Sequence, residues 1–218
     1  GLQVIDRSDR NNLKTVAGFA TEYRALALAK AGDVIVVKLE KHGLILVDVS
    51  DPLSPSFISQ FKPDISFFDI VAQGKTLFAS SIEGKLFKVD VSDPVSPRVV
   101  DSIDLLGRSR IAPVGDDIFV AAEKAGLRVV RFSREAPGKF ISSLTRPWPM
   151  RNFSQAKEIA VRDKYAYQLQ GSEGLQIIDI SNAESPKEFG FIPLPDRGLS
   201  IGLSETYVVV STRRNGYY

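Results

Sequence analysis

Residues 43–55 read GLILVDVSDPLSP, and residues 84–97 repeat this string with small changes as GKLFKVDVSDPVSP. Each stretch runs from a glycine through an apolar segment to an acidic residue, a serine and a proline-containing turn. Three further stretches keep the pattern: GLQVIDRS at 1–8, GLRVVRFS at 126–133 and GLQIIDIS at 174–181. The motif serines are separated by 42, 42, 41 and 48 residues, at Ser8, Ser50, Ser92, Ser133 and Ser181. An internal repeat therefore organises nearly the whole chain.

Each period predicts four short strands. In the first complete period the apolar stretches cover 25–28, 34–37, 44–47 and 57–61, and turn residues separate them. No apolar pattern with a 3.6-residue period lasts long enough for a helix. Four antiparallel strands every 40–45 residues are typical of a β-propeller blade, because one small sheet buries both faces only by stacking on its neighbours. We therefore predict an all-β propeller, with strands A to D counted outward from the axis and the glycine motif as strand C.

The two chain ends predict how the propeller closes. The chain opens on a C and D pair at 2–5 and 14–19, and it finishes on an A and B pair at 199–203 and 207–211. Gly216 then starts another motif 215 residues after Gly1. We expect five four-stranded blades in a single domain, the N- and C-terminal segments sharing one blade; the alternative is a fragment of a larger propeller. The expected blades are 20–62, 63–106, 107–145, 146–195 and a composite of 196–218 with 1–19.

The motif resembles the LVIVD repeat. The strings LILVDVSDP at 44–52 and LFKVDVSDP at 86–94 carry the resemblance, which extends in weaker form over nearly the whole chain. That repeat occurs in propellers of bacterial and archaeal surface or secreted proteins. The resemblance implies an extracellular or cell-envelope location and a non-enzymatic binding role, since it brings no catalytic signature. The copy at 126–135 departs from the pattern, because Arg131 stands where the other copies have Asp.

Composition excludes several functions. The 218 residues contain no Cys and one His, His42, so disulfides, thiolate metal sites and multi-histidine metal sites are excluded. The net charge of +2 does not call for a nucleic-acid partner, and no apolar run approaches the ~20 residues of a membrane span. We expect a monomer with no bound cofactor or metal and no membrane insertion. We expect His42 to be an exposed turn residue.

The motif carboxylates, Asp6, Asp48, Asp90 and Asp179, invite either a structural or a chemical interpretation. The structural one is favoured, because an Asp at a strand end accepts hydrogen bonds from turn N–H groups. A second group of charges falls on the predicted inner strands, at Asp69, Arg110, Lys157 and Glu158. Three alternatives follow for these residues: they face water in the channel, they pair across blades, or they mark a ligand site.

The longest period contains the most specific irregularity. Its six extra residues fall near 145–153 and include Trp148, the only Trp, together with Arg151. This insertion joins strand D of one blade to strand A of the next, as do the segments that contain Arg108 and Arg197. Trp and Arg are enriched at binding hot spots. We therefore predict a ligand or partner site formed by Arg108, Arg110, Trp148, Arg151 and Arg197, the alternative being that Trp148 simply fills the channel mouth.

Three functions follow from these features. The first is a non-catalytic binding module for a protein or glycan, within a surface or secreted protein. The second is a carbohydrate-active hydrolase that uses two carboxylates at the channel mouth, with Asp64, Asp69, Glu158 and Asp196 as candidates. The third is a structural spacer without a ligand.

Overall fold

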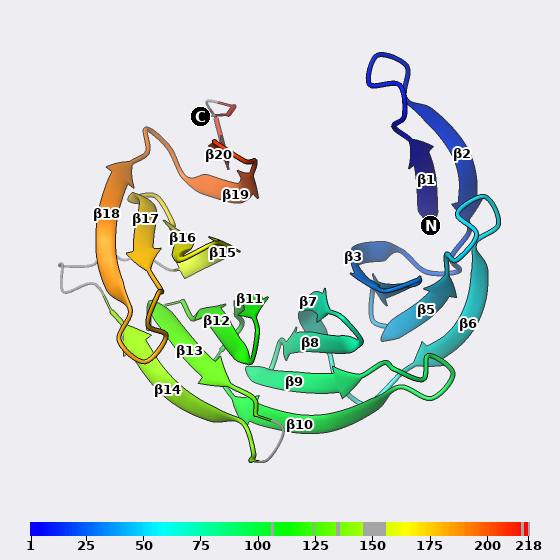
Figure 1. Cartoon of the computed structure of the whole chain (residues 1–218), viewed down its shortest axis with the longest axis horizontal. Coiled ribbons are helices and arrows are strands. Elements are labelled where there is room, and N and C mark those ends of the chain that lie inside the picture. Colours follow the sequence, from blue (N-terminus) through cyan, green and yellow to red (C-terminus); the bar gives the residue numbers. More distant parts are fainter. Residues whose placement is uncertain (106, 124, 134–135, 146–155, 215, 218) are drawn as a thin grey trace. The chain divides into compact units, whose positions relative to one another are not determined.

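The computed structural model describes residues 1–105, 107–123, 125–133, 136–145, 156–214 and 216–217. In these residues the chain forms strands and connecting loops, and no helix long and apolar enough to cross a membrane is found among them. The strands make four four-stranded sheets and two two-stranded sheets, each built from strands consecutive in sequence (Figure 1).

We number the four-stranded sheets as blades 1 to 4. Blade 1 contains β3 (Ala25–Ala31), β4 (Val34–Leu39), β5 (Leu44–Asp48) and β6 (Ser56–Phe61). Blade 2 contains β7 (Phe67–Gln73), β8 (Thr76–Ser81), β9 (Lys85–Asp90) and β10 (Arg98–Asp104). Blade 3 contains β11 (Arg110–Val114), β12 (Asp117–Ala121), β13 (Leu127–Arg131) and β14 (Lys139–Leu144). Blade 4 contains β15 (Ala156–Arg162), β16 (Tyr165–Gln170), β17 (Gly174–Asp179) and β18 (Lys187–Pro193).

The two-stranded sheets contain the ends of the chain. β1 (Leu2–Asp6) pairs with β2 (Lys14–Phe19), and β19 (Gly198–Leu203) pairs with β20 (Val208–Thr212), both antiparallel. By their place in the repeat these are a C and D pair and an A and B pair. Their union in one composite blade stays a prediction.

Two compact units divide the chain. Unit 1 comprises Gly1–Ala79 with Phe87–Val100, and unit 2 comprises Ser80–Leu86 with Asp101–Tyr218. In unit 1, one core cluster joins Val36, Leu44 and Leu46 of blade 1 to Phe67 and Leu77 of blade 2. A second cluster lies on the opposite face of blade 1, where Val37, Leu39 and Ile45 pack with Leu2 and Phe19. The adjacent residues Val36 and Val37 are both fully buried, which confirms the prediction of strands buried on both faces.

Unit 2 repeats this arrangement. Phe119, Ala121, Leu127 and Val129 of blade 3 pack against blade 4, through residues that include Ile159, Ala166 and Ile178. Leu169 and Leu175 of blade 4 then pack with Val210 of β20. Burial between successive sheets therefore supplies the hydrophobic stabilisation that one small sheet lacks.

The motif glycine is required by local geometry. Gly43 and Gly126 both have φ +73°. The Gly43 carbonyl accepts a hydrogen bond from the N–H of Leu39 at the end of β4, and the Gly126 carbonyl accepts one from the N–H of Ala122, directly after β12. A Cβ atom would lie 2.5 Å from the Phe61 carbonyl oxygen at Gly43 and 2.5 Å from the Leu144 carbonyl oxygen at Gly126. The tight B–C hairpin and the close approach of strand D therefore both select glycine.

A β-bulge recurs where strand D follows the motif strand. The register shifts between Val4 and Ile5, Leu46 and Val47, Val129 and Val130, and Ile177 and Ile178. The extra residue on strand D bends the outer strand and increases its twist. The repeating four-stranded sheets, with the glycine motif as third strand, confirm the predicted β-propeller fold.

Candidate functional site

The residues of the predicted binding site fall at one end of the sheets. Strand D runs into the next strand A at the same end at which strand B turns into strand C, and we call this the junction end. The predicted residues Arg108 and Arg197 lie there, on the segments that precede β11 and β19, and both are exposed. Arg110 is the first residue of β11. Trp148 and Arg151 lie outside the described residues.

Strand pairing defines one equivalent position near the start of each inner strand. Ala27 pairs with Lys38, Arg110 with Ala121, Glu158 with Leu169 and Ser200 with Ser211. Each partner lies beside the first residue of strand C, which makes these positions equivalent. Asp69 occupies the same position in blade 2 by its spacing from the A–B turn. The sequence thus places charged residues at this position in blades 2, 3 and 4.

In unit 2 these charges pair between neighbouring blades. The Arg110 Nε atom lies 3.6 Å from Glu158 Oε2, and the Lys157 Nζ atom lies 3.9 Å from Glu123 Oε1. Arg110 and Glu158 are partly exposed, with 37% and 24% of the side-chain surface accessible. Lys157 is the extra residue of a bulge in β15. Pairing across blades was one of the three predicted alternatives, and the structure confirms it for these residues.

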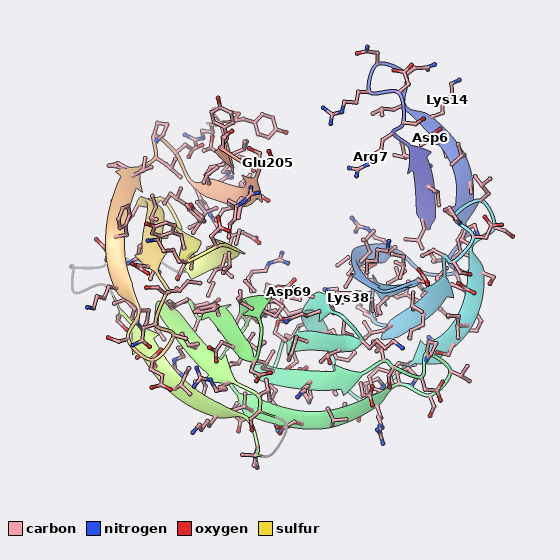
Figure 2. The ribbon with its side chains drawn as sticks, in the orientation of Figure 1. Asp6, Arg7, Lys14, Lys38, Asp69 and Glu205 are labelled. Carbon is pink, nitrogen blue, oxygen red and sulfur yellow. The ribbon has the colours of Figure 1, made fainter. Side chains whose placement is uncertain are left out.

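In unit 1 the corresponding end of blade 1 contacts blade 2 through a lysine. Lys38 on β4 donates through Nζ to the carbonyl oxygens of Phe67 at 3.2 Å and Phe68 at 2.6 Å on β7. Asp69 follows directly and is 8% exposed (Figure 2). This burial makes Asp69 part of the packing between the blades.

A basic cluster lies around β19 and β20. The Arg197 carbonyl accepts a hydrogen bond from the Arg213 N–H at 3.0 Å, and Asp196 Oδ2 accepts one from the Arg214 N–H at 2.6 Å. These bonds hold the segment before β19 against the hairpin after β20. Arg197, Arg213 and Arg214 are all exposed, and we call these three residues the basic cluster. The sequence analysis identified only Arg197 of these three residues. The hairpin after strand B falls at the junction end in every blade, and this rule also indicates Arg213 and Arg214.

Three of the four carboxylates proposed for hydrolysis, Glu158, Asp196 and Asp69, have structural roles. Glu158 forms the ion pair with Arg110, and Asp196 accepts the Arg214 N–H. Asp69 is buried, and Asp64 is exposed on the segment before β7. Within the described residues, no group of three or more His, Cys, Asp or Glu side chains is placed to hold a metal ion.

The motif aspartates form turns, as predicted. The Oδ1 atoms of Asp6, Asp48, Asp90 and Asp179 accept the N–H of the serine two residues later at 2.8–3.0 Å. A second Asx turn follows in each of these copies, at Asp9, Asp51, Asp93 and Asn182. Hydrogen bonds from the Ser92 hydroxyl and N–H, with a further one from Arg98, lower the pKa of Asp90 to about 2. These carboxylates are therefore committed to turn geometry.

Blade 3 replaces the motif Asp by a different interaction. Arg131 donates to both carboxylate oxygens of Asp117, at 2.6 and 2.9 Å, and to Glu184 Oε1 at 2.8 Å. Hydrogen bonds from the Arg131 side chain to Asp117 and Glu184 raise the pKa of Arg131. The substitution therefore exchanges a local turn contact for a bond to the turn of blade 4.

The expectation of a solvent-exposed His42 was wrong. His42 is half-buried, and its ring stacks on Tyr23 with centroids 3.3 Å apart and an interplanar angle of 11°. Its carbonyl accepts a hydrogen bond from Gln60 Nε2 at 3.0 Å. Stacking on an aromatic ring from outside the repeat motif is invisible in the local turn sequence.

The fold defines a β-propeller, and comparison with known proteins adds the family. The LVIVD repeat model matches residues 31–62 and 154–192, which lie in blades 1 and 4. These two segments are therefore LVIVD repeats, as the motif predicted. No curated protein matches the sequence.

Solved structures share the fold at low identity. A functionally unknown protein from Desulfotomaculum acetoxidans is 12% identical with a TM-score of 0.74, and the match covers 92% of this chain and 66% of that one. The β-propeller domain of Cps50 (Swd1) from Myceliophteria thermophila is 13% identical with a TM-score of 0.64, covering 85% and 64%. The computationally designed protein Ika8 is 8% identical with a TM-score of 0.66, covering 88% and 57%. The chain therefore spans about three fifths of the length of these structures.

Proposed function

We propose that this propeller is a non-catalytic binding module whose partner, a protein or a glycan, docks at the junction end of unit 2. The observation that carries the proposal is the basic cluster, three exposed arginines on two segments that are linked by the Arg213 N–H to the Arg197 carbonyl and by the Arg214 N–H to the Asp196 carboxylate. Arginine on loops fixed by a rigid scaffold is a common basis of recognition. We propose a monomer in an extracellular or cell-envelope location, which the resemblance to surface and secreted LVIVD proteins supports.

The pairing of the inner charges supports a binding role over hydrolysis. A glycosidase needs two carboxyl groups that flank a scissile bond and are free to exchange protons. Glu158 and Asp196 are instead engaged by Arg110 and by the Arg214 N–H. The three arginines of the basic cluster are exposed.

The test compares two double charge reversals. The protein is labelled and applied to an array of neutral, sulfated and uronic-acid oligosaccharides and of acidic peptides. We expect the wild type to retain a subset of the anionic probes, and R197E/R213E to weaken that binding by at least about tenfold, because two arginine contacts to an anion are lost. The matched control R7E/R10E reverses two charges in the turn between β1 and β2, at the end of that sheet opposite the junction end. The binding of this control should equal that of the wild type.

Two results would overturn the proposal. One is that neither oligosaccharides nor peptides are retained, or that both double variants lose binding equally. The other is cleavage of a bound oligosaccharide, followed by mass spectrometry, which would replace the non-catalytic role by a hydrolytic one.

A further inference from the structure

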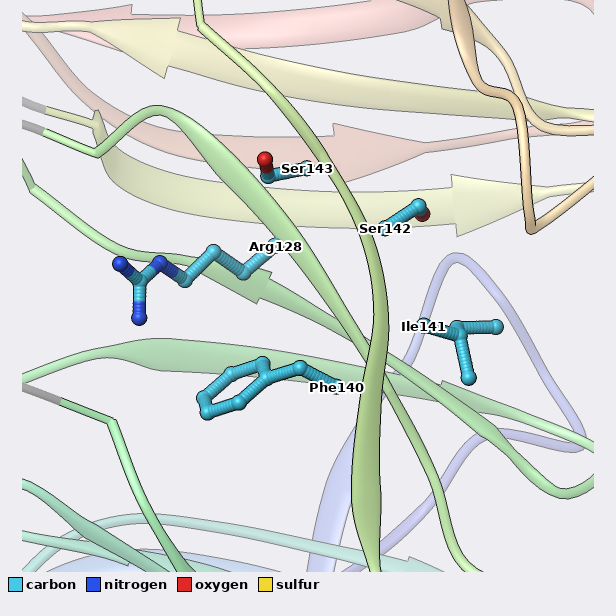
Figure 3. A pocket seen from close by; sticks show the side chains of 5 residues that line it. All are labelled: Arg128, Phe140, Ile141, Ser142 and Ser143. Carbon is cyan, nitrogen blue, oxygen red and sulfur yellow. The ribbon is translucent and has the colours of Figure 1, made fainter.

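A pocket of about 410 Å³ lies on the two outer strands of blade 3. It is lined by Arg128 of β13 and by four consecutive residues of β14, Phe140 to Ser143. β14 is the last strand of its sheet. Figure 3 shows Arg128, Phe140 and Ser143 on one side of β14, with Ile141 and Ser142 on the other.

The bulge explains why these three side chains share a side. Residues three apart on a regular strand point to opposite faces. Here Ser142 pairs with Val129 and Phe140 with Val130, so that Ile141 is the extra residue. The extra residue shifts the alternation by one and brings Phe140 and Ser143 to the face of Arg128. On the other side of β14, the Ser142 hydroxyl donates a hydrogen bond to the Ala183 carbonyl of blade 4.

Among the described residues, the contact found for the Arg128 guanidinium is with an aromatic ring and not with an anion. The guanidinium lies over the Phe140 ring, 5.1 Å from the centroid, and the side chain is half-buried. In the part of the chain that the structure describes, no carboxylate or carbonyl accepts a hydrogen bond from this guanidinium, and the pocket lining contains no acidic residue. Equivalent positions three residues before the motif acid hold Gln3, Ile45, Phe87 and Gln176, so the arginine is specific to this blade.

The pocket has a counterpart in the repeat that lacks these groups. A pocket of about 650 Å³ on the β1–β2 sheet is lined in part by Gln3, Thr15 and Gly18. Strand pairing makes these residues the equivalents of Arg128, Phe140 and Ser143. The hollow is therefore a consequence of the bulged outer strand, whereas the cation and the aromatic ring are additions on blade 3.

We propose that this pocket binds a uronic acid unit of an acidic glycan. A guanidinium stacked on a ring keeps its N–H edge free, and that edge suits a carboxylate in a bidentate arrangement. Phe140 is 41% exposed and offers a flat apolar surface to the C–H face of a sugar ring. The Ser143 hydroxyl can donate to and accept from sugar hydroxyls. The volume lies within the range of small-ligand pockets, ~300–1,000 Å³.

The strand edge argues against an acidic peptide as the occupant. A peptide that adds to a sheet edge needs a regular row of backbone donors and acceptors. The bulge at Ile141 interrupts this row in the middle of the pocket. A single sugar ring needs no such ladder.

The test is an amide NMR titration of the whole chain with sodium glucuronate. We expect shifts centred on Phe140 and Ser143 and a dissociation constant in the millimolar range. Methyl glucoside lacks the carboxylate and sodium acetate lacks the ring, so each should bind at least about tenfold more weakly. Arg128→Gln should weaken glucuronate binding at least about tenfold, because the cation is removed. Arg162→Gln, which changes another half-buried arginine of unit 2, should leave binding unchanged.

Several outcomes would overturn the proposal. These are no shift at β14 at high glucuronate concentration, shifts that Arg128→Gln leaves intact, or equal binding of N-acetylglutamate, which would assign the pocket to acidic protein segments. If Arg128→Gln fails to fold, Phe140→Leu keeps an apolar residue and should still lose glucuronate binding. R197E/R213E should bind glucuronate at β14 like the wild type, so a failure of the docking site at the junction end is distinguishable from a failure of this pocket.

Discussion

The motif Asp and the motif Ser form the smallest repeated unit of the structure. In four copies the carboxylate accepts the N–H two residues later, and a second Asx turn follows within three residues. The turn is therefore built by side chains as well as by proline, whose fixed φ favours it. Where the Asp is lost, as at Arg131, the Ser133 hydroxyl instead accepts the Ala136 N–H at 2.9 Å.

These aspartates predict a pH dependence of stability. Asp90 has a pKa of about 2 in the folded protein, against about 3.9 in an unfolded chain. A lowered folded-state pKa stabilises the fold above the unfolded value, and this contribution is lost as the pH falls from about 4 to about 2. Hydrogen bonds from Ser8, Ser50 and Ser181 also lower the pKa of Asp6, Asp48 and Asp179, so they add to the same acid transition.

Urea denaturation at a series of pH values tests this prediction. Asp90→Asn keeps an oxygen that can accept the Ser92 N–H but cannot titrate, so the fall in stability towards low pH should become shallower than in the wild type. Ser92→Ala removes only the hydroxyl donor and should give an intermediate slope. An unchanged acid slope in Asp90→Asn would show that this aspartate does not contribute.

At the scale of elements, side chains of the outer strands link each blade to the next. The Ser59 hydroxyl donates to the Pro94 carbonyl at 2.6 Å, the Asp101 carboxylate accepts the Gly138 N–H at 2.7 Å, and the Ser142 hydroxyl donates to the Ala183 carbonyl at 2.5 Å. All three residues occupy the same position of strand D, and all three partners lie in the C–D turn of the following blade. These contacts supplement the apolar packing between inner strands.

One buried amide side chain in blade 4 lacks hydrogen-bond partners among the described residues. Gln168 on β16 is fully buried, and neither its Oε1 nor its Nε2 has a hydrogen-bond partner in the described part of the chain. The equivalent residues in other sheets are Val37, Val120 and Val210. The neighbouring Gln170 and Gln176 are instead linked, because Gln170 Nε2 donates to Gln176 Oε1 at 2.7 Å, and Gln176 Nε2 donates to Glu188 at 2.8 Å.

Two identical substitutions should therefore have opposite effects. Gln168→Met removes an unsatisfied buried amide at similar volume, and we expect the free energy of unfolding to rise by about 1–3 kcal/mol. Gln176→Met breaks the hydrogen-bonded chain and should lower it by about 1 kcal/mol or more. Denaturant unfolding of both variants with an unchanged m-value makes the comparison. Equal destabilisation by the two substitutions would contradict this interpretation of Gln168.

At the scale of the whole molecule, the predicted composite blade gives β20 and β1 a common sheet. The repeat fixes the register of that pairing: Val36 pairs with Leu46 in blade 1, and the same positions are Val209 on β20 and Val4 on β1. The hairpin after β20 turns like the others, since the Thr212 N–H donates to the Gly216 carbonyl at 2.7 Å and Ser211 bridges to Tyr217. In the register given above Leu2 takes this place opposite Ser211, so β1 joins β20 only if Tyr217 moves aside. The alternative of a fragment from a larger propeller predicts a different neighbour for each edge.

A disulfide tests the composite blade directly, because the chain has no cysteine of its own. In V4C/V209C we expect an intramolecular disulfide under mild oxidation at low protein concentration, with a raised melting temperature. The control T15C/V209C places the first cysteine on β2, two strands away from β20 in that blade and too far for a disulfide. Intermolecular disulfides alone in V4C/V209C would favour the fragment.

The sequence by itself determined the repeat, the strand order within a blade and the role of the motif Asp. Each of these depends on contacts within one period: alternation, a glycine at positive φ, and a carboxylate two residues from its donor. The same locality predicted the LVIVD resemblance at 44–52, which the family model matched within 31–62.

Only the tertiary structure decided which charges remain available to a ligand. Arg110 stood with Arg108 and Arg197 in the predicted site, and Lys157 was an inner-strand charge of open role. Neighbouring blades supply Glu158 and Glu123 as the partners of Arg110 and Lys157. The pocket at Arg128 was equally hidden, because a bulge on β14 turns Phe140 and Ser143 towards it. Such features depend on which residues of adjacent strands and blades come into contact. The contacting residues belong to separate repeats, so the sequence of a single repeat does not predict them.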